Sequence, residues 1–358
     1  MKIHSALPVL FLSVMIAAQA ADTFVIESIK LTNASAIEWD GRSNETIDSL
    51  VIAKPVSILL RHCSNIVISG CDLRSIELVE CRNIIIRNCW IHESAHPGVE
   101  VFKSGQVVIQ GCRMESVPSG VYAIESKQIK VIGNFVRNVK GPFPRGQLAQ
   151  FNKVSGEGNV IRGNYAINDD GQSSPEDVIS LYASNGTESS PILIEDNYLT
   201  GDPRRGSSGK SKSGSGIMLG DSGGSYLTCR RNTITDAGQV GIGVAGGSFV
   251  RVEANLTYGR KSDVSNVGLY LWNQSGAPST HVSILRNRVY WLNQRGEVNS
   301  WWNGSGVQEV EIRDNQFVDL TLEGALPPPP SHAPIPPQPW LTTNPDGTSI
   351  ARFPWKTQ

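Results

Sequence analysis

Four residues of this sequence could carry acid–base chemistry on a sugar: the carboxylates Glu176, Asp177 and Asp221, and the basic Lys153. Hydrolysis of a glycosidic bond uses two carboxyl groups, one kept protonated near neutral pH by burial or a like charge, and one that activates water. Adjacent residues of a strand point to opposite sides, so Glu176 and Asp177 cannot face each other. Asp221 is therefore the expected partner across a groove.

A second assignment of roles uses Lys153 instead. Elimination at a uronate needs a base near the sugar C5 and a cation that neutralises the sugar carboxylate. Lys153 and Arg145 suit these two roles, with Tyr182 as the acid. The protein would then be a lyase or epimerase.

Five apolar segments between residues 147 and 274 must position these groups. Their alternation predicts half-buried strands, with one set of residues facing the core and the other facing out. The residues expected inside are Ala149, Phe151, Ile179, Leu181, Ile217, Leu219, Ile242, Val244, Leu269 and Leu271. The residues expected outside are Gln150, Asn152, Ser180, Tyr182, Met218, Gly220, Gly241, Gly243, Tyr270 and Trp272.

This outer face indicates a groove for an extended sugar chain. Its middle glycines remove side chains from the floor, and its tyrosines and tryptophan form aromatic walls for sugar rings. A merely solvated face would more often carry Lys, Glu and Thr. The residues predicted to bind substrate are Arg145, Gln147, Asn152, Tyr182, Gln239, Tyr270, Trp272 and Asn273.

These strands belong to a repeat that runs through most of the chain. Each repeat is a short strand with alternating apolar residues that ends in Cys or Asn, and the end residues lie 18 to 35 positions apart. Asn tolerates left-handed backbone at a bend, and stacked Asn amides can bond along a ladder. The end residues are Cys71, Cys89, Cys112, Asn134, Asn164, Asn197, Asn232, Asn255, Asn287 and Asn315.

One fixed turn residue per repeat predicts an all-β, right-handed parallel β-helix solenoid of about ten or more coils, rather than an antiparallel sandwich. Over most of residues 51–318 the sequence resembles the pectate-lyase-like superfamily. Residues 21–50 are expected to cap the first coil. Residues 319–358 form a Pro-rich tail, which lies along or caps the solenoid or serves as a free recognition segment.

The first twenty residues read as a cleavable signal peptide, because a basic start and a short apolar run precede Ala18-Gln19-Ala20. The protein is therefore expected to be secreted or periplasmic. In that setting the six cysteines could pair, since Cys63 and Cys81, like Cys71 and Cys89, lie 18 residues apart, one coil length. Stacked reduced thiols would fit the same core equally well.

Two short stretches resemble enzyme families. Glu176-Asp177-Val178-Ile179-Ser180-Leu181 and residues 214–220, GSGIMLG, are similar to two motifs of family 28 glycoside hydrolases. That resemblance implies Glu176 and Asp177 as the acid–base pair, although Ser215 stands where the family has a histidine. Residues 151–164, FNKVSGEGNVIRGN, are similar to the strand of family 6 polysaccharide lyases that carries a base lysine, which implies that role for Lys153. Tyr182 occupies the place of their arginine.

The composition of the chain limits the classes of molecule that it is expected to bind. The net charge of -1 argues against nucleic-acid binding, and no segment after the signal peptide is long enough to span a membrane. A polysaccharide or oligosaccharide is the expected partner of a monomer. No metal or other cofactor is indicated by spacing, although calcium stays open. A non-catalytic sugar-binding or adhesion solenoid is the third interpretation.

Overall fold

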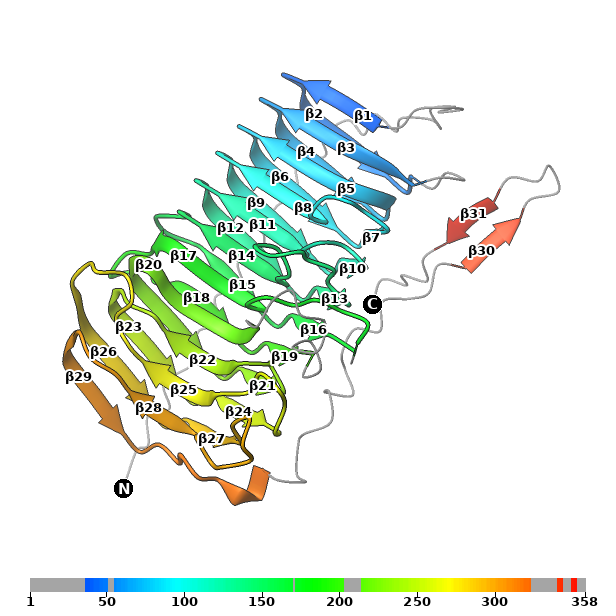
Figure 1. Cartoon of the computed structure of the whole chain (residues 1–358). Helices are drawn as coiled ribbons and strands as arrows, with labels where there is room; N and C mark the ends of the chain where they lie inside the picture. Colours follow the sequence, from blue (N-terminus) through cyan, green and yellow to red (C-terminus); the bar gives the residue numbers. More distant parts are fainter. Residues whose placement is uncertain are drawn as a thin grey trace, which may run out of the picture.

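The computed structural model describes residues 36–50, 55–169, 171–202, 214–322, 340–343 and 349–352. Within these residues the chain winds into a parallel β-helix whose 29 strands form one continuous hydrogen-bonded system (Figure 1). This confirms the predicted solenoid. In the described part of the chain, no helix is long and apolar enough to cross a membrane.

Each coil contributes strands to three sheets, which the chain visits in the order first, second, third. The first sheet carries the predicted outer face. Its strands are β1 (Ala36–Asp40), β3 (Val56–Arg61), the later part of β5 (Asp72–Val79), β8 (Val99–Phe102), β11 (Val121–Ile124), β14 (Ala149–Asn152), β17 (Ile179–Asn185), the first part of β20 (Ser215–Arg230), β22 (Val240–Val244), β25 (Val267–Leu271) and β28 (Trp301–Asn303).

The second sheet consists of the strands that precede the Cys and Asn anchors. They are β2 (Ser43–Asp48), β4 (Ser64–Ser69), β6 (Arg82–Arg87), β9 (Gly105–Gln110), β12 (Lys127–Ile132), β15 (Val160–Arg162), β18 (Ile192–Glu195), the later part of β20, β23 (Ser248–Glu253), β26 (Ser279–Leu285) and β29 (Val307–Arg313).

The third sheet follows the anchors. Its strands are the first part of β5, β7 (Trp90–His92), β10 (Arg113–Glu115), β13 (Phe135–Arg137), β16 (Tyr165–Ile167), β19 (Tyr198–Thr200), β21 (Thr233–Thr235), β24 (Leu256–Gly259) and β27 (Arg288–Trp291).

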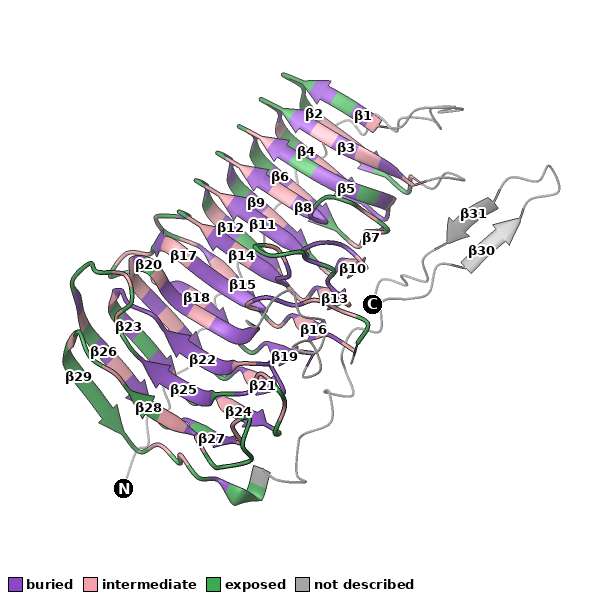
Figure 2. Cartoon of the chain, in the orientation of Figure 1, coloured by how far each residue is buried: buried purple, intermediate pink, exposed green. Residues whose placement is uncertain are grey.

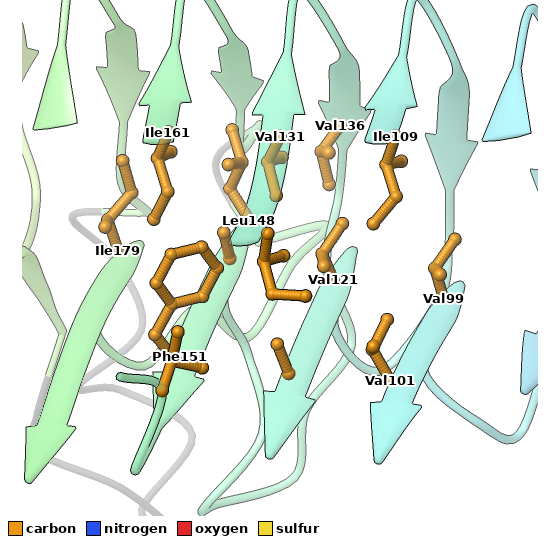
Figure 3. Close-up of a cluster of buried hydrophobic side chains, with 14 of the residues drawn as sticks. Val99, Val101, Ile109, Val121, Val131, Val136, Leu148, Phe151, Ile161 and Ile179 are labelled. Atoms are coloured by element: carbon orange, nitrogen blue, oxygen red, sulfur yellow. The ribbon is translucent and has the colours of Figure 1, made fainter. Parts of the chain in front are cut away.

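The core fills the inside of the three sheets. Alternation holds in the first sheet, because all ten residues predicted to face inward are fully buried. Figure 3 shows how Val121 and Phe151 from the first sheet meet Val131 from the second and Val136 from the third. Along the solenoid, buried and exposed residues alternate within most strands (Figure 2).

The predicted Asn ladder is present and runs unbroken from Asn134 to Asn315. The predicted left-handed backbone, however, belongs to the residue before each anchor, such as Gly133 or Arg231, and not to the Asn itself. Each side-chain Nδ2 donates to the Oδ1 of the anchor in the next coil, at 2.9–3.0 Å. The same Oδ1 accepts the backbone N–H of the preceding anchor. The second Nδ2 hydrogen of Asn232 goes to the Ile194 carbonyl at 3.0 Å. The ladder thus satisfies polar groups at a corner that water cannot reach.

A second ladder, which sequence analysis did not find, lies at the corner between the first and second sheets. There Ser104 Oγ accepts the N–H of Cys81 at 2.9 Å, and Ser126 Oγ accepts the N–H of Ser104 at 3.0 Å. Further along, Ser184 Oγ accepts the N–H of Val154 at 3.1 Å. The six cysteines are all buried and unbridged. Burial raises the pKa of the Cys81 thiol to about 11, so it stays neutral.

The ends of the solenoid differ from the predicted boundaries. The first coil already begins at Ala36, because β1 pairs with β3 and β2 pairs with β4. Those residues lie in the segment that was expected to be a cap. The predicted signal peptide lies outside the described residues. After the short 3₁₀ helix η2 (Leu320–Leu322), the tail contributes an antiparallel hairpin of β30 (Trp340–Thr343) and β31 (Ser349–Arg352).

The ladder makes a stability prediction at Asn232. Changing Asn232 to Leu leaves two N–H groups of Asn197 and the Ile194 carbonyl without their partner in a buried corner. We expect a loss of about 3 kcal/mol in the free energy of unfolding, measured by urea denaturation. Asn266→Leu, at an exposed position, is the control and should change it by less than about 0.5 kcal/mol. Equal losses in both variants would contradict the ladder's role.

Candidate functional site

The first sheet presents one row of outward-facing residues, here called the outer row, with one residue per coil. Register pairs place its members side by side along the solenoid. Its members are Glu77, Glu100, Tyr122, Gln150, Ser180, Met218, Gly243, Tyr270 and Trp302. Parallel strands lie about 4.8 Å apart, so the row runs along the solenoid. Tyr122, Ser180 and Tyr270 within it are themselves buried.

Asp221 enters this face through an irregularity in β20. The register between β17 and β20 shifts on both sides of the pair Tyr182 and Asp221, which lie opposite each other. Gly220 makes this possible, because its φ is +66° and a Cβ there would lie 2.1 Å from the Gly246 carbonyl oxygen. Burial raises the pKa of Asp221, and a hydrogen bond from the Ser222 backbone partly offsets this.

Asp177 lies just before β17, at the start of the same strand pair. The expectation that Glu176 and Asp177 sit on opposite sides of a strand is wrong, because both precede Ile179, where β17 begins. Burial raises the pKa of Asp177 from 3.8 to about 7, and the charges of Glu176 and Asp221 add to the rise. Hydrogen bonds from Ser215 oppose it. Asp221 is therefore close enough to raise the pKa of Asp177.

Tyr270 completes what we call the carboxylate site, which consists of Asp177, Asp221, Tyr270 and Gln274. The Tyr270 hydroxyl accepts a hydrogen bond from Gln274 Nε2 at 2.9 Å and donates one to the Met218 sulfur at 3.3 Å. Burial raises its pKa, and the charges of both aspartates raise it further. The phenol therefore stays protonated and can donate to a bound group.

The space for the Tyr270 ring is provided by Gly243. A Cβ at Gly243 would lie 2.7 Å from the ring and 2.9 Å from the Met218 sulfur. The predicted open glycine floor is thus wrong at this position, since the tyrosine occupies it. Gly241 is not part of the floor either, because a Cβ there would meet Thr257 at the neighbouring corner.

Two tryptophans stand at the downstream end of the row. Trp272 is 40% exposed and Trp302 is 45% exposed, and their ring centroids lie 5.6 Å apart at 74°. Trp302 also lies 6.4 Å from Tyr270. The exposure of Trp272 agrees with the predicted strand register. The sequence analysis missed Trp302, because the three-residue strand β28 does not show the alternating apolar pattern of the strands upstream.

Near neutral pH the site can supply both a protonated and an ionised carboxyl group. A carboxyl with a pKa of about 7 is protonated in part of the population and can give up a proton. The second aspartate can accept one, and both aspartates lie near enough to Tyr270 to raise the pKa of its hydroxyl. Among the described residues, no group of three or more His, Cys, Asp or Glu side chains is placed to hold a metal ion.

Two residues predicted to bind substrate have structural roles instead. Gln147 is fully buried, where its Oε1 accepts from Ser119 at 2.8 Å and its Nε2 donates to the Pro144 carbonyl at 2.9 Å. The Asn273 amide donates to the carbonyl of Ala277 in its own loop and to that of Gly306 in the next coil. A strand pattern in the sequence cannot distinguish a polar side chain that bonds the backbone from one that binds a substrate.

The structure places the other predicted binding residues on or beside the outer face. Arg145 lies 3.6 Å above the Tyr122 ring and donates to Gln150 Oε1 at 2.6 Å. Asn152 donates to the Tyr122 hydroxyl at 3.0 Å. Gln239 directly precedes β22, and its N–H bonds the Gly214 carbonyl, beside the coil that carries Ser215.

Lys153 stands apart from the carboxylate site. It forms the bend after β14 with a φ of +56°, and its backbone N–H bonds the Tyr182 carbonyl. Its side chain is 59% exposed, with Nζ 3.8 Å from Glu125. The side chain thus lies at the bend with Glu125 rather than among the groups of the carboxylate site.

Comparison with known proteins agrees with the fold. The family model described as "Right handed beta helix region" matches residues 35–206, which include strands β1 to β19. The chain is thus a right-handed parallel β-helix protein, as predicted. The finer resemblances to family 28 hydrolases and family 6 lyases did not emerge from these comparisons, and no curated protein sequence matched.

Three solved structures illustrate the likeness. A variant catalytic domain of GH87 alpha-1,3-glucanase in complex with tetrasaccharides is 12% identical, with a TM-score of 0.43; the match covers 78% of this chain but only 64% of that one. PfbA, a surface adhesin of Streptococcus pneumoniae, is 12% identical over 79% of this chain and 73% of its own, with a TM-score of 0.43. An alginate lyase from Paenibacillus sp. str. FPU-7 is 14% identical over 75% and 99%, with a TM-score of 0.40.

The raised pKa of Asp177 predicts how stability depends on pH. Its folded pKa of about 7 lies above its ordinary value of 3.8, so the folded state binds the proton more tightly and the free energy of unfolding falls between about pH 4 and pH 7. Asp177→Asn should remove this part of the fall. We expect the variant to be about 1–3 kcal/mol more stable than wild type above pH 7 and equally stable near pH 4.

Urea unfolding at several pH values measures this difference. Asp263→Asn, which changes an exposed carboxylate elsewhere, should follow the wild-type curve. If the free energy of unfolding of Asp177→Asn fell with pH as steeply as that of wild type, the Asp177 carboxyl would have an ordinary pKa in the folded protein.

Proposed function

We propose that the protein binds a polysaccharide along the outer row and hydrolyses a glycosidic bond at the carboxylate site. The observation that carries this proposal is the Asp177 carboxyl with a pKa of about 7, raised by burial and by the charges of Glu176 and Asp221, on a sheet whose downstream end carries two exposed tryptophans. Titratable groups perturbed by burial and by a specific charged neighbour are typical of catalytic sites. An extended face with aromatic rings suits a sugar chain.

In this mechanism Asp177 is the general acid and Asp221 the general base. Asp177 gives its proton to the glycosidic oxygen as the bond to the anomeric carbon breaks. Asp221 takes a proton from water, whose oxygen bonds to the anomeric carbon from the other side. One water is consumed, and exchange with solvent restores both protons. This course inverts the anomeric configuration.

Tyr270 would assist by donating a hydrogen bond to substrate or water, since Gln274 fixes its hydroxyl and its pKa is raised. Glu176 is buried beside Asp177 and would serve by raising the pKa of that acid. This mechanism needs no ion or cofactor. That the protein is a monomer, and that it acts outside the cytoplasm, are both still predictions.

The lyase alternative is disfavoured by the place of Lys153. It would need Lys153 unprotonated at the sugar, whereas the side chain lies at an exposed bend beside Glu125. The two mechanisms are separated by their products. A lyase creates a double bond that absorbs in the ultraviolet, a hydrolase creates only new reducing ends, and a pure binding protein creates neither.

The test of the mechanism compares Asp221→Asn with Lys153→Met on a panel of polysaccharides. Asp221→Asn should lower turnover by at least about a hundredfold, as expected for a lost base, with an unchanged melting temperature. Lys153→Met should retain wild-type turnover. The reverse pattern, with ultraviolet-absorbing products, would establish the lyase. A large loss of stability in Asp221→Asn would make Asp221 a structural turn residue.

The aromatic end of the row generates a binding prediction. Trp272→Ala and Trp302→Ala should each weaken oligosaccharide binding by about 1–2 kcal/mol, the effect of one lost aromatic contact. Both rings are exposed, so the free energy of unfolding should hardly change. Isothermal titration with Phe143→Ala as control tests this, because Phe143 is also an exposed aromatic residue but lies on a loop. Unchanged affinity in both variants would remove the rings from the binding surface.

A further inference from the structure

Aromatic rings lie on the outer face on both sides of the carboxylate site, but only the downstream rings are accessible. Downstream, Trp272 and Trp302 are 40% and 45% exposed. Upstream, Tyr122 is only 7% exposed, although it stands between two core residues of β11 and so points away from the core. The two sides of the site therefore offer different surfaces to a sugar chain.

The Arg145 guanidinium covers the upstream ring. Its central carbon lies 3.6 Å from the centroid of the Tyr122 ring, and its Nη1 donates to Gln150 Oε1 at 2.6 Å. Tyr122 and Gln150 are neighbours in the outer row, so the arginine spans two consecutive strands. A cation at this distance occupies the ring face on which a sugar would otherwise stack.

The segment that carries Arg145 is held by buried hydrogen bonds. The hydroxyl of the fully buried Ser119 accepts the N–H of Gly146 at 3.0 Å. The Gly146 carbonyl in turn accepts the N–H of Glu176, also at 3.0 Å, and a Cβ at Gly146 would lie 2.5 Å from that nitrogen. Arg145 is thus fixed beside the residue that precedes Asp177, because moving its backbone would break buried hydrogen bonds.

The carboxylate site consequently lies close to the upstream limit of the accessible face. Gln150, which holds Arg145, pairs with Ser180 of β17, the strand that begins just after Asp177. The covered stretch therefore starts one strand spacing, about 4.8 Å, from β17. Downstream, the row continues from Met218 through three register pairs to Trp302, which is roughly 14 Å at the same spacing.

We propose that Arg145 ends the sugar-binding face on the upstream side, so that the protein cleaves bonds near one end of a polysaccharide chain. This inference rests on the proposed function, whose mode of cleavage it specifies. The body of the chain lies downstream, on Trp272 and Trp302, and only terminal sugars reach past the carboxylate site to Arg145. A longer upstream portion is rejected because it meets the guanidinium instead of a ring. A face open on both sides would accept the chain at internal bonds.

The cleavage pattern tests this inference. The full chain is incubated with soluble glucans, polygalacturonate, alginate and deacetylated chitin, and new reducing ends are compared with the viscosity of the solution. Wild type should release short products while the viscosity stays nearly constant. Arg145→Ala opens the upstream side and should halve the viscosity after at least about fivefold fewer cleaved bonds than wild type. A wild-type viscosity that falls as steeply per cleaved bond as that of the variant would overturn the inference.

Arg42→Ala is the matched control. Arg42 also lies over an aromatic ring, 4.8 Å from the Trp39 centroid, but it belongs to the first coil, and its variant should cleave as wild type does. Thermal unfolding shows whether each variant is folded. Should Arg145→Ala fail to fold, Gln150→Ala removes the hydrogen bond that holds the guanidinium and should shift the pattern in the same direction. A wild-type pattern in every folded variant of this pair would contradict the role of Arg145.

Binding separates this inference from the proposed function. Isothermal titration uses oligosaccharides of increasing length from the same polymers. Wild-type affinity should stop rising once the chain spans the distance from Asp221 to Trp302, whereas Arg145→Ala should continue to gain affinity with longer chains. If this difference appears without cleavage, the blocked upstream side stands and hydrolysis is wrong. If wild type cleaves internal bonds, the hydrolase stands and the chain-end inference fails. If no probe is bound or cleaved, both are wrong.

Discussion

The structure depends on the hydrogen-bonded ladder of asparagines from Asn134 to Asn315. Each amide bonds its neighbours above and below and also the backbone of the bend, so a coil cannot slip without leaving buried polar groups unsatisfied. A slip of one residue would exchange the inner and outer faces of every strand. From Asn134 onward, the ladder therefore sets the register on which both the core and the outer row rely.

A fixed register turns a chain of variable coils into a continuous functional surface. Coil lengths differ widely between anchors, yet residues such as Gln150, Ser180 and Met218 fall in line, because the extra residues leave the sheet as loops. One loop is held from inside by buried Gln147 and Ser119, and it carries Arg145 to the Tyr122 ring. Polar residues in such a loop can thus serve the site without touching a substrate.

The carboxylate site arises where that regularity breaks. The bulge around Asp221 turns its carboxylate toward the face that Asp177 approaches from the start of β17. Burial raises the pKa of both aspartates, and the charges of Glu176 and Asp221 raise that of Asp177 further. Two carboxyl groups with raised pKa values destabilise the folded protein above neutral pH. Such destabilisation is common at catalytic sites and is not expected of a surface that is only structural.

The sequence by itself determined the solenoid, the anchors and the two faces of each strand, because these follow from local periodicity and from one repeated turn residue. It also singled out Asp177, Asp221, Tyr270 and Trp272. Only the tertiary structure decided which of the polar residues act together. Gln147 and Asn273 proved to hold the backbone, Lys153 lies at an exposed bend, and Trp302 and Glu100 join the row. The physical reason is that ionisation, burial and contact between coils depend on residues about thirty positions apart, which no strand pattern relates.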